Sequence, residues 1–304
     1  MSADSPPAAA RFRIRHTTKY SYTDPAPVCH NALHLMPRTT PWQQCRAYRL
    51  AISPEPAEKS WRTDLFDNRV DYFSVHEPHR GMAITAHSEV EVQPRPGLSK
   101  DAIVAWDAVA EDLRSGQASR EPGVVQFRFP SQQAPIEAQI GAYAAESLQP
   151  GRSIVEALRE LTQRIHADFR FDPKATNVST PVHEVFEKRA GVCQDFAHLQ
   201  ISCLRSLGLA ARYVSGYLRT LPPPGKPRLI GADASHAWVS AYCGAAGWID
   251  FDPTNDVMPN EGPALDHVTV AYGRDYADVC PIQGVFVGGG QHTMSVEVDV
   301  MPLP

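Results

Sequence analysis

The sequence lacks a long apolar run. No segment of its 304 residues approaches the roughly 18 apolar residues that a membrane-spanning helix needs. The N-terminal stretch MSADSPPAAARFRIRH also lacks the positively charged start and apolar segment of a secretory signal. These absences predict a cytoplasmic protein with no membrane partner.

Positive charge is also scarce. The 29 Lys and Arg are outnumbered by 34 Asp and Glu, which gives a formal net charge of -5. A broad nucleic-acid-binding surface needs an excess of Lys and Arg, so we expect no nucleic-acid partner. The glycine-rich stretch GVFVGGGQ at 284–291 lacks the lysine and the following helix of a phosphate-binding loop, and it is predicted to be a turn into the last strand.

Cysteines are few and unpaired in the sequence. The six are Cys29, Cys45, Cys193, Cys203, Cys243 and Cys280, with no CxxC pair among them. This spacing predicts neither a disulfide framework nor a structural zinc site. Most of these residues are expected to be small buried side chains. Cys193 differs, because it lies two residues after a glycine and begins an apolar helical pattern.

The chain is long enough for two compact units, each with its own core. Apolar residues alternate with polar ones between residues 11 and 92, which predicts a β-rich N-terminal domain over 11–95. Helical spacing at 101–114 and 134–148 predicts a helical connector over 96–150. The proline-rich stretch at 221–227 is predicted to be a loop, either at the rim of a cleft or at an ordinary surface position.

Residues 151–300 are predicted to form an α+β core, a helix cluster packed on an antiparallel sheet. One helix begins after Ser153, and another is expected to begin after Thr180, with Pro181 in its first turn, and to be ended by Gly191. Strand patterns follow at 211–220, 235–242 and 248–252. The alternating segment at 294–300 is assigned to the same core.

Cys193 is expected at the start of a helix, where unpaired backbone N–H groups stabilise a thiolate. A nucleophilic thiolate needs a base and a group that orients the base. A hairpin centred on Gly244 would place His236 opposite Asp252 and Trp238 opposite Asp250, with all four side chains on one face. We therefore predict Cys193, His236 and Asp252 as catalytic residues, with Asp250 as second choice for the carboxylate.

Two other interpretations stay open at this point. Cys193, His198, His236 and Cys243 could ligate zinc, although the paired cysteines of structural zinc sites are missing. The chain could also be a catalytically silent module that binds a protein through its β-rich N-terminal domain. His198 is expected near the site without a catalytic part, while Gln194 and Asp195 line the cleft or cap the helix.

GVCQDFAH at 191–198, SHAW at 235–238 and GWIDFDPTN at 247–255 occur in order, and the chain resembles the transglutaminase-like superfamily, specifically a bacterial branch of candidate cysteine proteases. The resemblance implies a papain/transglutaminase-like core and assigns Cys193 as nucleophile, His236 as base and Asp252 as third member of a triad. The N-terminal part resembles the β-rich domain that often precedes this core in bacteria.

The resemblance implies acyl transfer on a peptide or protein substrate through a cysteine thioester, with water or an amine as acceptor. No cofactor and no metal are expected. Nothing in the sequence distinguishes a peptidase or amidase from a transglutaminase-type transferase.

Overall fold

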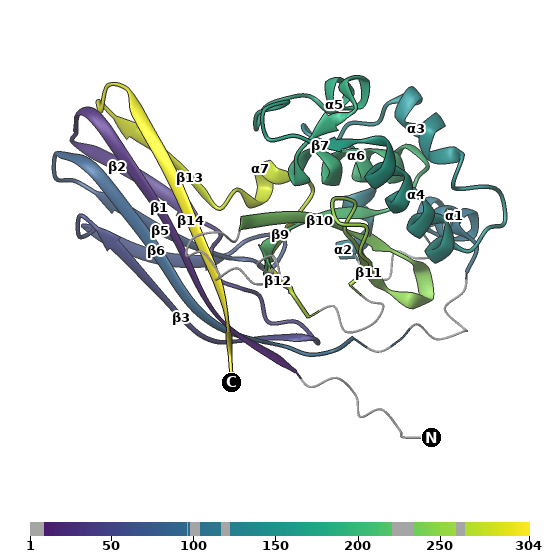
Figure 1. Cartoon of the computed structure of the whole chain (residues 1–304), viewed down its shortest axis with the longest axis horizontal. Coiled ribbons are helices and arrows are strands. Elements are labelled where there is room, and N and C mark those ends of the chain that lie inside the picture. The colour runs from purple at the N-terminus through teal and green to yellow at the C-terminus, as the bar shows by residue number, and fades with distance from the viewer. Residues whose placement is uncertain (1–8, 96, 98–103, 117–121, 221–233, 260–264) are drawn as a thin grey trace, which may run out of the picture.

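The computed structural model describes residues 9–95, 97, 104–116, 122–220, 234–259 and 265–304. The proline-rich stretch at 221–227 and the first residues of the helix expected at 101–114 lie outside these ranges. The described chain forms a β-rich part and a mixed part that lie side by side (Figure 1).

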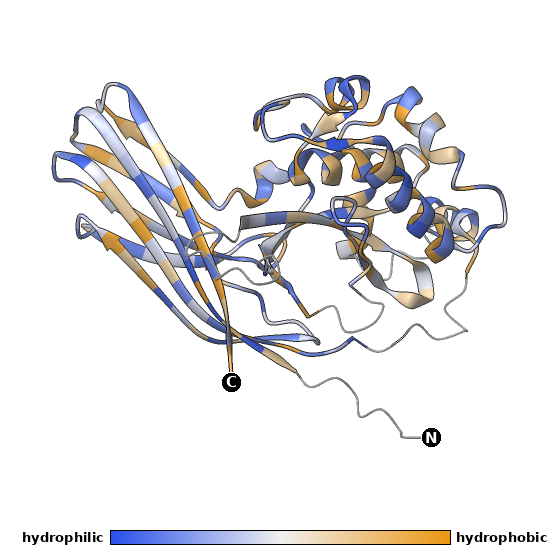
Figure 2. Cartoon of the chain, in the orientation of Figure 1, coloured by the Kyte–Doolittle hydropathy of each residue, from blue (hydrophilic) through white to orange (hydrophobic). Residues whose placement is uncertain are grey.

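The β-rich part consists of two antiparallel sheets of four strands each, with the orders β14-β1-β6-β3 and β13-β2-β5-β4. Buried and half-buried residues alternate along most of β6, because successive side chains point to opposite faces. Figure 2 shows hydrophilic and hydrophobic residues interspersed along the ribbons of this part. The strands are β1 (Ala10–Ala26), β2 (Val28–Leu33), β3 (Gln43–Ser53), β4 (Glu58–Thr63), β5 (Arg69–Val75), β6 (His79–Val92), β13 (Ile282–Val287) and β14 (His292–Leu303).

The two C-terminal strands do not join the core, to which the sequence pattern assigned them. β14 pairs with β1 from Arg11↔Leu303 to Tyr22↔His292, and β13 pairs with β2. The β-rich part is therefore built from both ends of the described chain. The glycine-rich segment predicted as a turn contains the last residues of β13 and then three glycines with positive φ, Gly288, Gly289 and Gly290, which lead into β14.

The mixed part is an α+β unit whose antiparallel sheet has the order β11-β10-β9-β12. Helix α6 packs against β9 and β10 on one side and against α3 on the other, and it is buried along most of its length. The strands are β9 (Ala211–Leu218), β10 (Ala234–Tyr242), β11 (Trp248–Phe251) and β12 (His267–Gly273), with a short parallel pair of β7 (Arg170–Phe171) and β8 (Ala190–Gly191).

The helices match most of the segments that the sequence predicted. They are α1 (Trp106–Ser115), α2 (Pro122–Val125), α3 (Ala138–Ala145), α4 (Ile154–Asp168), α5 (Val182–Lys188), α6 (Cys193–Ser206) and α7 (Tyr276–Val279), with 3-10 turns at Gln126–Arg128 and Gly244–Ala246. None of the helices within the described ranges is both long and apolar enough to span a membrane.

The end of α5 differs from the prediction. Arg189, not Gly191, ends this helix in the left-handed region at φ 51°, and Pro181 is its N-cap residue. Gly191 instead lies in β8, where an added Cβ would come within 2.7 Å of the Asp195 carboxylate. The glycine is required for the close approach of the next helix, and it does not act as a helix stop.

A single apolar cluster joins the two parts. It contains Phe12 and Ile14 of β1 and Val298 and Val300 of β14, together with Leu199 of α6. A second cluster, around Leu33, Phe73 and Ile84, fills the β-rich part alone. Because apolar interiors are close-packed, the shared cluster fixes how the β-rich sheet lies against the core.

We expect Gly216→Ala to destabilise the protein by about 1–3 kcal/mol, the usual cost of overpacking a close-packed interior. A Cβ on Gly216 would overlap the Val268 carbonyl and the Trp238 ring, both in neighbouring strands. Urea unfolding measures the change. Gly123→Ala is the matched control, since nothing lies within 4 Å of its added Cβ. Equal stability of the two variants would contradict this account of Gly216.

Candidate functional site

Cys193 is the first residue of α6 and is half-buried. Its backbone N–H therefore has no acceptor within the helix, which leaves a donor beside the thiol. The Asp195 carboxylate accepts hydrogen bonds from the Val192 N–H at 2.8 Å and the Thr176 hydroxyl at 2.6 Å. Burial raises the pKa of Asp195, against the effect of these two hydrogen bonds. Asp195 thus caps the helix, as the sequence allowed, while Gln194 lines the cavity next to Cys193.

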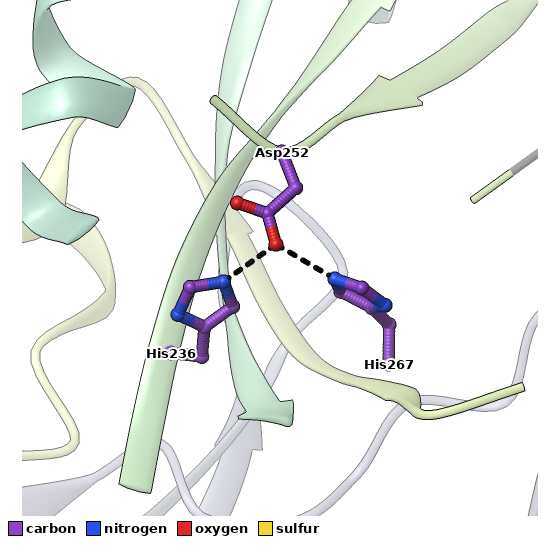
Figure 3. Close-up of side chains that lie close together, drawn as sticks. All are labelled: His236, Asp252 and His267. Atoms are coloured by element: carbon purple, nitrogen blue, oxygen red, sulfur yellow. Dashed lines mark hydrogen bonds and ion pairs between the residues drawn. The ribbon is translucent and has the colours of Figure 1, made fainter. Parts of the chain in front are cut away.

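His236 lies on β10, and Asp252 directly follows β11. The His236 Nε2 lies 2.8 Å from the Asp252 Oδ2, and both side chains are buried (Figure 3). The contact that the hairpin argument predicted between these two residues is present. Their catalytic roles stay a prediction.

The register of this hairpin differs from the predicted one by two residues. Ser240 pairs with Asp250 and Tyr242 with Trp248, where the sequence argument had paired Trp238 with Asp250. Trp238 accordingly does not face Asp250, and His236 is not paired with Asp252 across the ladder. A shift by two residues keeps every side chain on its face, so His236 still reaches Asp252 diagonally.

The Asp252 carboxylate accepts five hydrogen bonds. Its Oδ2 accepts from His236, from the His267 Nε2 at 2.9 Å and from the Asn255 amide at 2.8 Å. Its Oδ1 accepts from the backbone N–H groups of Thr254 and Asn255 at 3.0 and 3.2 Å. A fully buried carboxylate needs such partners, because desolvation of an unpaired charge costs several kcal/mol.

His267 was not found by the sequence analysis. It lies at the start of β12, is buried, and points at Asp252 from the side opposite His236 (Figure 3). No local pattern marks it, because its approach to Asp252 depends on the pairing of β12 with β9. A signal for it would have required knowledge of the strand order.

The interaction between His236 and Asp252 shifts the pKa values of both residues. Burial alone would lower the pKa of His236, but the hydrogen bond and charge of Asp252, with a smaller contribution from a hydrogen bond to Cys193, raise it to about 10. Burial would raise the pKa of Asp252, but His236 and His267 hold it well below its ordinary value. An imidazolium–carboxylate pair is therefore the stable form near neutral pH.

His236 contacts both Cys193 and Asp252. Because Asp252 binds its Nε2, the Nδ1 is the ring nitrogen left for the thiol. A histidine held in this way can take the proton of the thiol while the carboxylate stabilises the resulting imidazolium. The structure thus brings together all three residues that the sequence singled out.

Asp250, the second choice for the carboxylate, has other partners. Its Oδ2 accepts hydrogen bonds from the Trp238 indole N–H at 3.2 Å and from Arg95 at 2.8 Å. The Trp238 ring in turn stacks on His236, with centroids 6.0 Å apart, and meets His267 edge-on at 5.1 Å. Asp250 therefore holds the aromatic ring that packs against both histidines.

The zinc set considered from the sequence is not assembled. Among the described residues, the one group with metal-ligand spacing is His236, Asp252 and His267, whose ligand atoms lie within 4.8 Å of one another. The hydrogen bonds to Asp252 account for that spacing. His198 is buried, and its Nε2 accepts the backbone N–H of Tyr276 at 3.1 Å. Burial lowers the pKa of His198 to about 4, which keeps it a neutral acceptor that ties α7 to α6.

Comparison with known proteins agrees with this architecture. Residues 12–91 match the bacterial transglutaminase-like N-terminal region, and residues 141–253 match the transglutaminase-like superfamily. An uncharacterized protein of Mycobacterium tuberculosis is 42% identical over 315 residues, covering 99% of this chain and 98% of that protein. A protein-glutamine gamma-glutamyltransferase of Pseudomonas aeruginosa is 33% identical over 150 residues, covering 47% of this chain and 22% of that protein.

A solved structure of a candidate cysteine protease from Cytophaga hutchinsonii is similar in fold, with a TM-score of 0.76 at 22% identity. The match covers 99% of this chain and 93% of that one. The chain belongs to the transglutaminase-like superfamily, and its α+β, papain/transglutaminase-like core follows a β-rich N-terminal region.

The raised pKa of His236 predicts how stability depends on pH. Its value is about 10 in the folded protein and about 6.5 in an unfolded chain, so its contribution is complete below pH 6.5 and is lost as pH rises toward 10. The lowered pKa of Asp252 makes the same pair lose stability as pH falls below about 4. Urea unfolding between pH 5 and 10 should therefore show a steeper decline for the wild type than for His236→Gln. The exposed His76, changed to Gln, is the control and should leave the decline unchanged.

His267 is expected to act as a positioning residue for Asp252. With Cys45 and Cys280 changed to Ser, Cys193 is the one cysteine that is not buried, so its alkylation by iodoacetamide can be followed alone. His267→Ala should slow this alkylation about tenfold near pH 7, the size of effect seen when an outer hydrogen bond orients a functional group. His267→Gln, whose amide can still donate to Asp252, should recover most of the rate. Equal alkylation rates in the Ala and Gln variants would contradict a role for the hydrogen bond from His267 to Asp252.

Proposed function

We propose that the protein is a thiol-dependent acyl-transfer enzyme that acts on peptide or amide bonds, with Cys193 as nucleophile, His236 as base and Asp252 as orienting carboxylate. The observation that carries the proposal is the position of His236, which contacts Cys193 and Asp252 at once. The membership of the transglutaminase-like superfamily supports it, as does the similarity to a glutamyltransferase.

In the proposed reaction the proton of the Cys193 thiol has passed to the His236 Nδ1 before the substrate binds, in keeping with the raised pKa of this ring. The thiolate sulfur then attacks the carbonyl carbon of an amide. The resulting oxyanion is stabilised in part by the backbone N–H of Cys193, which the helix leaves without an internal acceptor. His236 then protonates the leaving nitrogen, the C–N bond breaks, and a thioester remains. Water or an amine then attacks the thioester, and His236 accepts the proton of this acceptor. The C–S bond breaks, and the proton returns to the sulfur. The product is a carboxylic acid when water is the acceptor and a new amide when an amine is.

Asp252 does not take a proton in this scheme. Five hydrogen-bond donors surround its carboxylate and hold its pKa well below the ordinary value, so the negative charge persists throughout. Its part is to hold the ring of His236 in one orientation and to stabilise the imidazolium. The hydrogen bond from His267 supports the same arrangement from the other side.

The test is a comparison of wild type and Cys193→Ala on a library of peptides, with and without added methylamine, with products identified by mass. We expect Cys193-dependent products that 1 mM EDTA does not suppress. Hydrolysis alone identifies a peptidase or amidase, and amine adducts identify a transferase. Cys45→Ala, a half-buried thiol on β3, is the matched control and should keep full activity.

An absence of any Cys193-dependent product would contradict the proposal and favour the silent binding module. The cytoplasmic location and a peptide or protein partner also stay predictions.

A further inference from the structure

A cavity of about 450 Å³ lies beside Cys193 and His236. One wall belongs to the core, where Val192, Cys193 and Gln194 lie next to residues of β9 and β10. The opposite wall is the face of the β-rich sheet formed by β1 and β14. The volume is typical of a site for a small ligand or a few residues of a peptide.

The β1–β14 wall is built from three cross-strand pairs, His16↔Val298, Thr18↔Val296 and Tyr20↔Met294. The three β14 side chains become steadily more exposed along the strand, with Val298 at 2%, Val296 at 46% and Met294 at 59%. The cavity therefore has a closed end at Val298 and an open end at Met294. At this open end, about half of the surface of Met294 and of Val296 is exposed.

Charge is kept off this wall. The alternate residues of β14 face the other side of the sheet, where Glu297 meets Lys19 at 3.4 Å and Asp299 meets Arg15 at 2.7 Å. None of the described residues that line the cavity is Asp, Glu, Lys or Arg. At the closed end, His16 is hydrogen-bonded to the Tyr217 hydroxyl, and burial lowers its pKa to about 4. The described residues of the β1–β14 wall therefore carry no charge at physiological pH, and the one charged ring among the described lining residues, His236, is paired with Asp252.

An edge strand that exposes apolar side chains is an aggregation hazard, and proteins usually break such edges with charges. Here the charges lie on one face of β14, and the apolar residues face the nucleophile. Since Cys193 and His236 lie on the opposite wall of this cavity, its occupant must carry the group that Cys193 attacks. A charged occupant would lose its hydration without gaining an oppositely charged partner among the described residues of the β1–β14 wall.

We propose that the β14 wall of Met294 and Val296, together with Tyr20, is the subsite for uncharged, apolar side chains next to the amide that Cys193 attacks. The proposal rests on the proposed function, and it assigns the choice of acyl donor to the β-rich part. The substrate class is a peptide segment in which the reactive amide is flanked by aliphatic or aromatic residues. Charged residues at the same positions are disfavoured.

Binding to the Cys193→Ala protein tests the subsite without turnover. The probes are fluorescein-labelled pentapeptides with one central glutamine flanked on each side by two residues of Leu, Ser, Glu or Lys, and their binding is measured by fluorescence anisotropy. We expect the Leu peptide to bind at least tenfold more tightly than the Glu and Lys peptides. Met294→Ser and Val296→Ser should each weaken its binding about fivefold, because each removes apolar contact area. Val296→Lys should shift the preference toward the Glu peptide.

Met301→Ser is the matched control. Met301 is 40% exposed on the same strand, but its side chain lies on the opposite face and outside the cavity. It should not change binding of any peptide, and thermal unfolding checks that every variant is folded. Equal binding of the four peptides, no binding of any, or an equal loss in Met301→Ser would overturn the subsite.

Turnover of the same peptides by the wild type separates this inference from the proposed function. Cys193-dependent turnover without a preference for the Leu peptide would overturn the subsite and support the proposed enzymatic function. A clear preference for the Leu peptide in binding, with no Cys193-dependent product, would support the subsite as a ligand-binding groove and contradict the enzymatic function.

Discussion

The arrangement of the site depends on the burial of one carboxylate. Asp252 is fully enclosed, and a buried charge is tolerated only when donors replace its lost water. Those donors come from β10, from the start of β12 and from the turn after β11. Three segments that are separate in the sequence must therefore meet at the Asp252 carboxylate before His236 is held in place. The negative charge also keeps the imidazole protonated, which links the stability of the site to its chemistry.

A second constraint places Cys193, the proposed nucleophile. Cys193 is at the start of α6, a helix that is buried on almost every side and packed between α3 and the sheet. Its first turn is fixed by Asp195, which approaches closely because residue 191 has no side chain. The thiol and the imidazole thus come from two rigid elements in contact with each other, α6 and β10. A site built on such elements loses little precision to loop motion.

The wall opposite these residues is fixed by the same packing. The apolar cluster that contains Leu199 of α6 also contains Phe12, Ile14, Val298 and Val300 of the β-rich sheet. The strand pairs that continue from these residues, Thr18↔Val296 and Tyr20↔Met294, are the ones that line the cavity. The β-rich part is therefore continuous with the core, and it closes the site on one side.

The sequence predicted the parts of this arrangement that local pattern controls, and it missed those that depend on long-range pairing. The face shared by His236 and Asp252 follows from the two-residue period of a strand, so it survived an error of two in the register. His267 could not be found in this way, because it approaches Asp252 from a strand that enters the sheet next to β9. The same limit explains β14: its alternation shows that one face is buried, but not that its partner is β1, about 280 residues earlier. β14, one of the two wrongly assigned strands, supplies Met294, Val296 and Val298 to the apolar wall, so the feature that bears on substrate choice was the one least accessible from the sequence. An enzyme and a binding module would use this same wall, and they differ only in what Cys193 does to the occupant.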